Sequence, residues 1–381
     1  MNQAVPPPPI PFIDLGAQRR RLGRRIDEAV ARVIDSTAYI LGPEVQQVEA
    51  DLAAFCGAKH VISCSNGTDA LALVLMARGV GPGQAILCPS FTYAATAEVV
   101  ARAGATPVFL DVHEDTFNLD PAAIGPALQT ARDAKLEPVG IILVDLFGQA
   151  ADYDRLLPVC EQAGLWVLCD AAQSFGASYK GQRVGKYGIA TTTSFFPAKP
   201  LGCYGDGGAI FTDDAELDAT LRSLRFHGLG PERNDHVRIG MTGRLDTIQA
   251  AVLIEKLKIF EDEIAARNGI ARRYDEGLAE VAKVPFVLDG CTSTWAQYTI
   301  RVAPERRDSI AASLKARGIP TAVYYSKPLH QQTAYKTFPI GGNGLPVTDR
   351  LAQEVISLPM HPYLDEATQA LIIDAVRTAL A

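Results

Sequence analysis

Short apolar runs alternate with amphipathic segments along the first part of the chain. The apolar runs predict strands over 60–64, 85–88, 106–111, 139–145, 166–170, 191–196 and 208–211. Between most of them, apolar residues recur with a helical period, which predicts helices over 68–78, 93–103, 121–132 and 152–162. Strands that are apolar throughout and are separated by helices are typical of a parallel sheet covered on both faces. This part of the chain is therefore predicted to be an α/β domain.

The pattern changes on both sides of this region. Helices are expected over 17–37 and 43–55, and a long helical stretch over 246–280. It is followed by predicted strands over 298–302 and 321–325 and helices over 307–317 and 366–380. These elements predict a smaller α+β domain, so the chain is divided into 12–255 and 256–381. Residues 1–11, with four consecutive prolines, are expected to form an extended arm.

The composition narrows the class of protein. Of the 381 residues 48% are hydrophobic, which excludes a disordered chain, and no apolar run approaches the roughly 20 residues of a membrane span. The net charge of −7 and the lack of a basic run argue against nucleic acid or an anionic membrane as a partner. Seven cysteines without a CxxC pair are typical of a reducing compartment, and six histidines without HxH or HExxH spacing indicate no metal site. These features predict a soluble cytoplasmic protein without a metal.

Two charged residues follow neighbouring predicted strands, where open α/β sheets bind their ligands. Asp170 ends one strand, and Lys199 lies between Pro197 and Pro200 just past the next. A lysine that forms a Schiff base needs a rigid loop and partial desolvation, and an aspartate beside a pyridinium nitrogen keeps that ring protonated. The pair therefore indicates pyridoxal phosphate (PLP) chemistry. Taken singly, Lys199 is typical of a solvated loop, and Asp170 is equally typical of a helix N-cap.

Other residues of the same region suit a phosphate and a flat ring. In the motif SNGTDAL a predicted strand leads through Gly67 and Thr68 into a predicted helix. The first N–H groups of such a helix can bind an anion. The alternative is an ordinary helix N-cap without a ligand. Ser194 offers a hydroxyl, Tyr93 a ring and Gln173 a polar contact, although each alone is typical of an ordinary structural residue. Neither GxxxxGKS nor GxGxxG is present, so a nucleotide-dependent oxidoreductase or epimerase loses its main support.

Six motifs extend this pattern over nearly the whole chain: YILGPEV (39–45), SNGTDAL (65–71), PSFTY (89–93), DAAQSFGA (170–177), SFFPAKPLGCYGDGG (194–208) and RLDTIQAAVL (244–253). With them the chain resembles the nucleotide-sugar aminotransferases of the DegT type, within the fold-type-I PLP superfamily. The resemblance implies a large domain with a mostly parallel sheet, a smaller α+β C-terminal domain, PLP as the cofactor, and a homodimer with shared active sites.

The resemblance also implies roles for single residues. The cofactor-binding residues would be Gly67, Thr68, Tyr93, Asp170, Gln173, Ser194, Lys199 and Thr242. Among these, Lys199 and Asp170 would be catalytic: Lys199 bonds to PLP and moves the proton, and Asp170 pairs with the pyridinium nitrogen. Thr242 stands in GMTGRLD where family members have an asparagine that reaches the phosphate across the dimer interface.

The substrate is suggested by blocks such as YILGPEV and GIPTAVYYSKPLH. They look most like the enzymes that use L-glutamate to aminate carbon 3 of UDP-2-acetamido-2-deoxy-3-oxo-glucuronate, for bacterial surface polysaccharides such as lipopolysaccharide. The implied substrate residues are Arg244, Tyr324, Tyr325 and His330. Arg244 would bind the uronate carboxylate, and the relatives in question carry histidine in place of Tyr324. Two alternatives stay open: a 3- or 4-aminotransferase for a dTDP- or GDP-linked keto-deoxyhexose, and a PLP-binding regulator without turnover.

Overall fold

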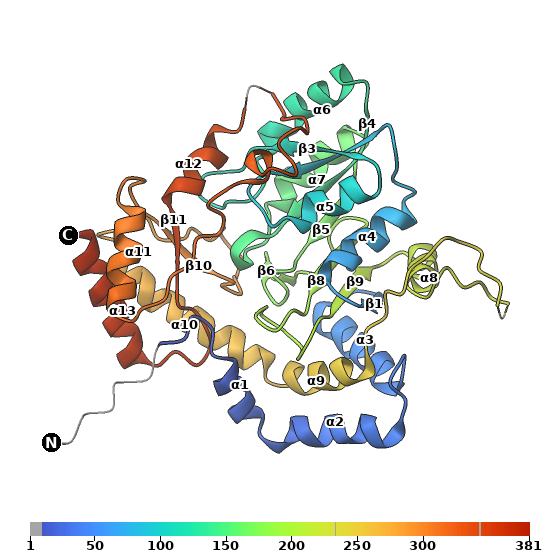
Figure 1. Ribbon diagram of the computed structural model, residues 1–381, viewed down its shortest axis with the longest axis horizontal. Coiled ribbons are helices and arrows are strands. Elements are labelled where there is room, and N and C mark those ends of the chain that lie inside the picture. Colours follow the sequence, from blue (N-terminus) through green and yellow to red (C-terminus); the bar gives the residue numbers. More distant parts are fainter. Residues whose placement is uncertain (1–9, 233, 343) are drawn as a thin grey trace.

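A seven-stranded sheet forms the centre of the molecule (Figure 1). The computed structural model describes residues 10–232, 234–342 and 344–381, so most of the predicted arm over 1–11 lies outside the described residues. The strands of the sheet are β1 (His60–Cys64), β2 (Gln84–Pro89), β3 (Thr106–Leu110), β4 (Glu137–Val144), β5 (Trp166–Asp170), β8 (Ala190–Ser194) and β9 (Gly208–Thr212). They lie in the order β1-β9-β8-β5-β4-β2-β3, which confirms the α/β class and all the strands predicted for this region.

One strand runs against the others. β9 is antiparallel to β1 on one side and to β8 on the other, while the remaining neighbours are parallel. The sheet is therefore mostly parallel, as the resemblance implies, and β9 is its antiparallel strand. Parallel neighbours need a long crossover, usually a helix, to bring the chain back to the same edge. The segment 195–207 between β8 and β9 contains no helix, so β9 returns beside β8 in the opposite direction.

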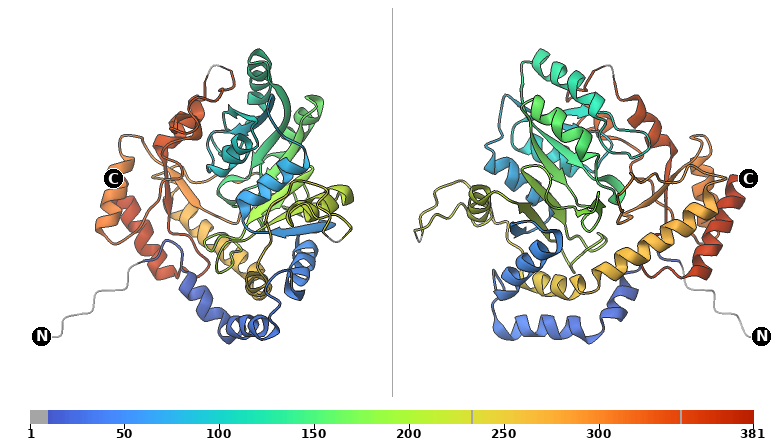
Figure 2. Two further views of the ribbon diagram at one scale, coloured as in Figure 1. Left: turned by 45° about the vertical axis from the view of Figure 1, so that its right-hand side comes forward. Right: turned by 180° about the vertical axis from the view of Figure 1, so that it is seen from behind.

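Helices cover both faces of the sheet (Figure 2). One face carries α4 (Gly67–Ala77), α5 (Ala95–Arg102) and α8 (Ala215–Leu224). The other carries α3 (Pro43–Cys56), α6 (Ile124–Asp133), α7 (Tyr153–Gln162) and α9 (Thr247–Leu257). Successive side chains of a strand point to opposite faces, so Ile86 packs with α4 and α5 while Leu87 packs with α6 and α7. Each such fully buried side chain stabilises the fold by roughly 1.5–3 kcal/mol.

The C-terminal part has a smaller core of its own. The long helix α10 (Phe260–Leu278) leads into it, as Figure 2 shows. Its other elements are α11 (Arg307–Ala316), α12 (Pro346–Glu354), α13 (Glu366–Leu380) and the antiparallel strands β10 (Tyr298–Arg301) and β11 (Val355–Leu358). The core unites side chains of α10, α11, α13 and both strands, among them Tyr274, Tyr298 and Ile356. The division into 12–255 and 256–381 stays a prediction, and its boundary lies within α9.

Two of the predicted helices are each divided in two. The stretch 17–37 contains α1 (Leu15–Leu22) and α2 (Arg24–Ser36), because Gly23 between them has a φ of +57°, outside the right-handed helical region. The stretch 246–280 contains α9 and α10, which are separated at Ile259 by a φ of −113°. Side-chain periodicity continues across such a break, so the pattern alone does not show it.

The predicted strand over 321–325 is wrong. Only Ala322 pairs, through two backbone hydrogen bonds of 3.2 and 2.7 Å with Ser357 of β11. Tyr324 and Tyr325 then leave the edge of the small sheet, and the ring of Tyr325 packs edge-on against Phe91 at 6.3 Å. An apolar run indicates burial, and here the burial comes from ring packing. The sequence pattern also missed α12, β11 and a short hairpin formed by β6 (Ser178–Tyr179) and β7 (Gln182–Arg183).

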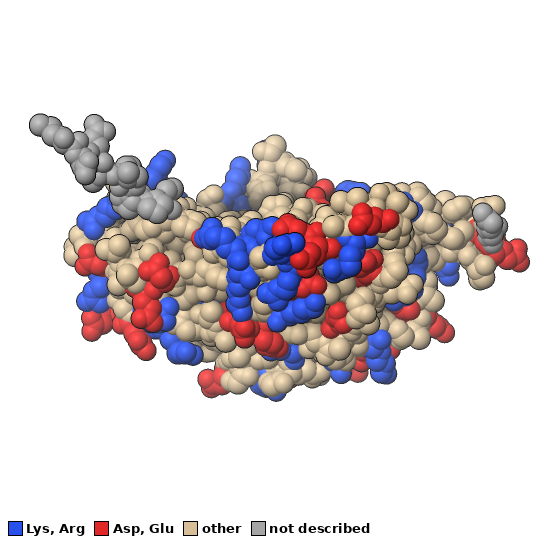
Figure 3. Space-filling model, turned by 90° about the horizontal axis from the view of Figure 1, so that it is seen from below, with Lys and Arg blue, Asp and Glu red and all other residues tan. Residues whose placement is uncertain are grey.

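Charges of both signs share the surface. Figure 3, seen from below the view of Figure 1, shows Lys and Arg side chains interspersed with Asp and Glu. Pairs such as Arg19–Asp27 (2.6 Å) and Arg21–Asp262 (2.5 Å) hold α1 to its neighbours. Within the described ranges, no helix combines the length and apolarity needed to cross a bilayer, and no group of His, Cys, Asp and Glu side chains could hold a metal ion. All seven cysteines have free thiols.

Candidate active site

A cavity of about 600 Å³ lies where β5 and β8 end. We call it the sheet-edge cavity. Its walls come from the first turn of α4, the segment before α5, the chain after β5 and β8, and two tyrosines of the C-terminal part. It is lined by these predicted site residues: Gly67, Thr68, Tyr93, Asp170, Gln173, Ser194, Lys199, Tyr324 and Tyr325. Its volume is typical of a small-molecule site, which usually measures about 300–1,000 Å³.

Asp170 and Lys199 line this cavity from neighbouring strand ends. Asp170 is 8% exposed, and its carboxylate accepts the Ala172 N–H at 3.0 Å. Burial raises the pKa of Asp170, while the Ala172 N–H and the charge of Lys199 oppose the rise. Burial likewise lowers the pKa of Lys199, and the charge of Asp170 opposes the fall. Lys199 therefore loses its proton more readily than a solvated lysine, as a nucleophilic amine requires.

A hydrogen-bonded loop holds Lys199. Its own N–H donates to the carbonyl of Phe196 at 2.8 Å, and the Cys203 N–H donates to the carbonyl of Phe195 at 2.8 Å, which closes the loop. The prolines on both sides of the Ala198–Lys199 pair further restrict the backbone. The amine is thus carried by a rigid segment, as the sequence predicts.

The first turn of α4 opens on the same cavity. Asn66 caps the helix by accepting the Asp69 N–H at 2.8 Å. The N–H groups of Gly67 and Thr68 have no intrahelical acceptor, because the helix begins at these residues. A Cβ atom at Gly67 would lie 2.6 Å from the Cβ of Ser194. Only glycine therefore allows the end of β8 to approach the helix so closely. The arrangement brings a hydroxyl group beside a helix N-terminus, which favours an anion.

Gln173 and Tyr93 line the same cavity. The Phe147 N–H donates to Oε1 of Gln173 at 2.8 Å, and Nε2 of Gln173 donates to the hydroxyl of Tyr325 at 3.2 Å. Both ends of this amide are thereby fixed. Tyr93 is 60% exposed and borders the cavity, so its ring face is accessible to a flat ligand.

Thr242 and Arg244 lie outside the sheet-edge cavity. They follow a loop beyond α8, whose described residues 229–232 and 234–239 extend away from the body of the molecule (Figure 1). The hydroxyl of Thr242 is 2.8 Å from Nε2 of His227, and the guanidinium carbon of Arg244 is 4.8 Å from the centre of the Phe226 ring. Their predicted roles toward phosphate and substrate stay predictions.

His330 also lies outside this cavity. Its Nδ1 is 2.7 Å from the hydroxyl of Ser90, and its Nε2 is 3.1 Å from the carboxylate of Asp349. Both ring nitrogens therefore have protein partners. A role for His330 toward the sugar stays a prediction.

Some residues that line the cavity were not predicted. They are Glu98 and Arg102 of α5, together with Phe196, Asp206 and Gln297. The four-residue spacing of Glu98 and Arg102 on a predicted helix places them on one face, and this signal was available in the sequence. Gln297 has no comparable signal, because it comes from the C-terminal part and no local motif surrounds it.

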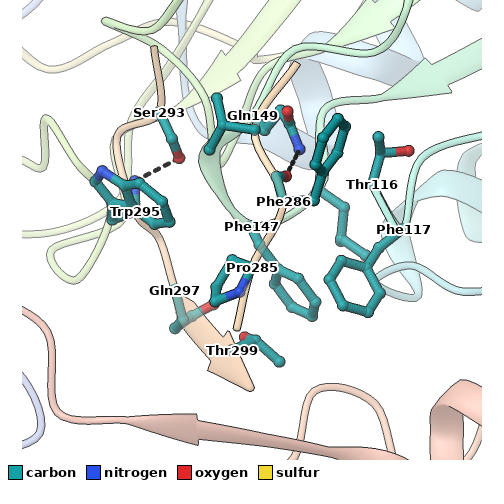
Figure 4. A pocket seen from close by; sticks show the side chains of 12 residues that line it. Thr116, Phe117, Phe147, Gln149, Pro285, Phe286, Ser293, Trp295, Gln297 and Thr299 are labelled. Carbon is teal, nitrogen blue, oxygen red and sulfur yellow. Dashed lines mark hydrogen bonds between the residues drawn. The ribbon is translucent and has the colours of Figure 1, made fainter. Parts of the chain in front are cut away.

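A second, smaller cavity shares Gln297 with the first (Figure 4). The rings of Phe117 and Phe147 lie on one side of it, and Trp295 lies across from them. Its volume of about 20 Å³ has room for about one water molecule, so it is too small for a cofactor.

The sheet-edge cavity fits PLP. The α4 N-terminus with Ser194 matches a phosphate, the accessible ring of Tyr93 matches a flat heterocycle, and the buried carboxylate of Asp170 matches a protonated ring nitrogen. Lys199 would supply the amine to which such a cofactor bonds.

Comparison with known proteins agrees with this fit. The model of the DegT/DnrJ/EryC1/StrS aminotransferase family matches residues 20–377. A UDP-2-acetamido-2-deoxy-3-oxo-D-glucuronate aminotransferase of Pseudomonas aeruginosa is 50% identical over 368 residues, which cover 96% of this chain and 99% of that protein. A pleiotropic regulatory protein of Geobacillus stearothermophilus is 41% identical, with 96% and 97% covered. The crystal structure of a DegT DnrJ EryC1 StrS aminotransferase from Brucella abortus is 53% identical, with a TM-score of 0.96, and the match covers 98% of this chain and 100% of that one.

Proposed function

This chain belongs to the DegT/DnrJ/EryC1/StrS aminotransferase family, and we propose that it transfers an amino group from L-glutamate to a keto-sugar nucleotide. As a member of that family it is a PLP-dependent transaminase. The observation that supports the proposal most is the meeting of Lys199 and Asp170 in one cavity with the α4 N-terminus. Schiff-base chemistry needs these three features together.

The substrate we propose is UDP-2-acetamido-2-deoxy-3-oxo-glucuronate, aminated at carbon 3, for a bacterial surface polysaccharide such as lipopolysaccharide. The 50% identity to the Pseudomonas aeruginosa relative over nearly the full length of both chains supports this choice. A uronate is an anion, and we assign its carboxylate to Arg244 of a second copy of the chain. Tyr324 and Tyr325, which line the cavity, would contact the sugar.

The proposed residues have distinct tasks. PLP, when bound, supplies an electron-withdrawing ring that stabilises negative charge on the adjacent substrate carbon. Asp170 pairs with the ring N–H and keeps it protonated. Lys199, whose pKa burial lowers, would act as the general base and acid that moves a proton between the substrate carbon and PLP. Gly67, Thr68 and Ser194 hold the phosphate, so that the ring stays aligned with Lys199.

We also propose that the working enzyme is a homodimer. Large apolar side chains are accessible on the segment beyond α8 and beside the cavity: Ile239 is 91% exposed, and Val237 and Phe196 are about half exposed. Thr242 and Arg244 lie outside their own chain's cavity, so a second copy would receive them. Sedimentation should give twice the chain mass of 40.8 kDa, and a fully active monomer would contradict the proposal. The free thiols and a nucleotide-linked substrate support a cytoplasmic location.

The test is glutamate-dependent amination of a panel of keto-sugar nucleotides, with the product identified by mass. Wild-type protein should aminate the 3-oxo-glucuronate derivative. Lys199→Ala should abolish both transfer and covalent trapping of PLP by borohydride, because no other residue supplies the bonded amine. Lys186→Ala, at an exposed lysine that precedes β8 and does not line the cavity, is the control and should retain both. Trapping that survives in Lys199→Ala would refute the assignment of Lys199.

A second candidate is a PLP-binding regulator without turnover, which the 41% identity to the Geobacillus protein favours. In that case glutamate leaves the absorbance band of bound PLP unchanged. Transfer to a dTDP- or GDP-linked keto-deoxyhexose, at carbon 3 or 4, is distinguished by the member of the panel that gains nitrogen.

A further inference from the structure

Asp145 is a buried carboxylate that the proposed chemistry does not use. It follows β4 directly, where Val144 pairs in register with Asp170 of β5. Val144 lines the sheet-edge cavity, and successive side chains alternate, so Asp145 points to the opposite face of the sheet. It is fully buried there, behind the residues that line the cavity.

Three donors converge on this carboxylate. The Ala151 N–H donates at 2.8 Å, the hydroxyl of Tyr153 lies 2.8 Å from both carboxylate oxygens, and the hydroxyl of Ser174 donates at 2.8 Å. In the part of the chain that the structure describes, no Lys, Arg or His forms an ion pair with it. Burial raises the pKa of Asp145 to about 7, the three donors oppose the rise, and the charge of Asp170 adds to it. Such a group is expensive to bury, which suggests a specific task.

The contacts of Asp145 reach the turn that carries Asp170 and Gln173. Its backbone N–H donates to the carbonyl of Asp170 at 3.0 Å, and its carboxylate holds Ser174, the neighbour of Gln173. Two residues further along, the Phe147 N–H holds Oε1 of Gln173 at 2.8 Å. The segment 145–147 therefore holds this turn from behind at the backbone, at Ser174 and at the Gln173 amide.

We propose that Asp145, acting through Ser174, is a positioning residue that sets where Asp170 and Gln173 meet the cofactor ring. The inference rests on the proposed function, because it assumes that these two residues contact PLP. The competing account is that Asp145 only stabilises the fold by joining α7 to the sheet.

Two hydroxyl deletions separate these accounts. Ser174→Ala and Tyr153→Phe each remove one buried hydroxyl that donates to Asp145, but only Ser174 belongs to the turn. In the holoenzyme, Ser174→Ala should lower kcat about tenfold with less than a twofold change in KM for glutamate, a rate change of the size that one lost buried hydrogen bond produces. It should also shift the pH midpoint of the absorbance band of bound PLP. Tyr153→Phe should lower the thermal midpoint similarly and leave kcat and the spectrum at wild-type values.

Equal kinetic and spectral effects of both variants, or none in Ser174→Ala, would overturn the positioning role. Asp145→Asn adds a further check: it keeps the shape, and both hydroxyls can turn to suit the amide, so kcat should fall less than in Asp145→Ala. If Ser174→Ala does not fold, Ser174→Cys takes its place, because the thiol retains a weak donor. Its kcat should likewise lie below that of Tyr153→Phe. Failure of the proposed function shows separately, as wild-type protein that aminates no keto-sugar although its PLP band titrates normally.

Discussion

At Gly67 the end of β8 comes against the first turn of α4. A methyl group there would meet the Cβ of Ser194 at 2.6 Å, well inside the distance that side chains tolerate. Gly125, near the start of α6, has nothing within 4 Å of the same hypothetical atom. Alanine adds the same methyl group at both positions. At Gly67 this group contacts the proposed phosphate site, and at Gly125 it lies in open space.

Gly67→Ala should weaken PLP binding, because the added methyl group pushes the α4 N–H donors away from Ser194. We expect the dissociation constant of PLP, measured by absorbance titration, to rise at least about tenfold, which corresponds to about 1.4 kcal/mol. Gly125→Ala should leave that constant unchanged and raise the free energy of unfolding by up to about 1 kcal/mol through helix propensity. The same dissociation constant in both variants would contradict the role of Gly67.

Residues of the site could be identified from sequence where the chemistry is contained in one local motif. Asp170 ends a predicted strand, Lys199 follows the next one closely, and the SNGTDAL motif indicates a helix N-terminus. Gln297 and the anchoring of Ser174 by Asp145 could not be found in this way. Their roles depend on which distant segments become neighbours, and no local pattern encodes that.

At the scale of elements, α9 supports the loop that carries Lys199. Lys256 is 1% exposed and donates to the carbonyl of Gly202 at 2.5 Å, while its ammonium lies 4.4 Å from the centre of the Tyr204 ring. Burial lowers the pKa of Lys256 to about 8. Two turns earlier on the same helix, the side-chain oxygen of Gln249 accepts the Tyr204 N–H at 2.8 Å. The helix thus holds the loop at residues that follow Lys199 closely.

Lys256→Met should slow catalysis, because it leaves the Gly202 carbonyl without its donor and loosens the loop. A buried acceptor without a partner costs about 1–3 kcal/mol, and we expect kcat to fall about tenfold with KM for glutamate little changed. Lys258→Met, at a half-exposed lysine of the same helix end, should keep the wild-type kcat. Steady-state kinetics of the two variants decide the point, and indistinguishable kcat values would exclude a supporting role for α9.

Elements were predictable where periodicity and length agree, as in α4, α7 and the strands of the large sheet. The break at Gly23 and the loss of a strand at 321–325 were not. In both places the apolar pattern shows which side chains are buried. It does not show the backbone conformation, because that depends on how the segment packs.

At the scale of the whole molecule, His361 lies where the N-terminal segment, α10 and the chain before α13 come together. It is 3% exposed, and neither ring nitrogen has a hydrogen-bond partner among the described residues. Burial lowers the pKa of His361 to about 4, and the neighbouring charge of Arg267 adds to the fall, while Asp14 and Asp365 oppose it. A neutral imidazole is therefore part of the folded state.

This histidine should make the protein sensitive to acid. Between pH 6.5 and about 4 the unfolded chain binds a proton that the folded chain refuses, so the free energy of unfolding falls as the pH falls through this window. Below pH 4 the free energy of unfolding is lower by about 3 kcal/mol than it would be without this shift. His361→Phe should flatten the pH dependence of urea unfolding between pH 6.5 and 4, whereas replacement of the exposed His236 by Gln should not. An unchanged slope in His361→Phe would contradict this account.

The sequence by itself determined the α/β class, the order of strands and helices in the large domain, and the residues whose chemistry fits PLP. Those features follow from local burial, helix and turn preferences and strand ends, which neighbouring residues encode. Only the tertiary structure decided that β9 runs antiparallel, that Gln297 joins the predicted residues in the cavity, and that Asp145 lies behind it. These depend on contacts between residues tens to hundreds of positions apart, and packing in three dimensions selects such contacts.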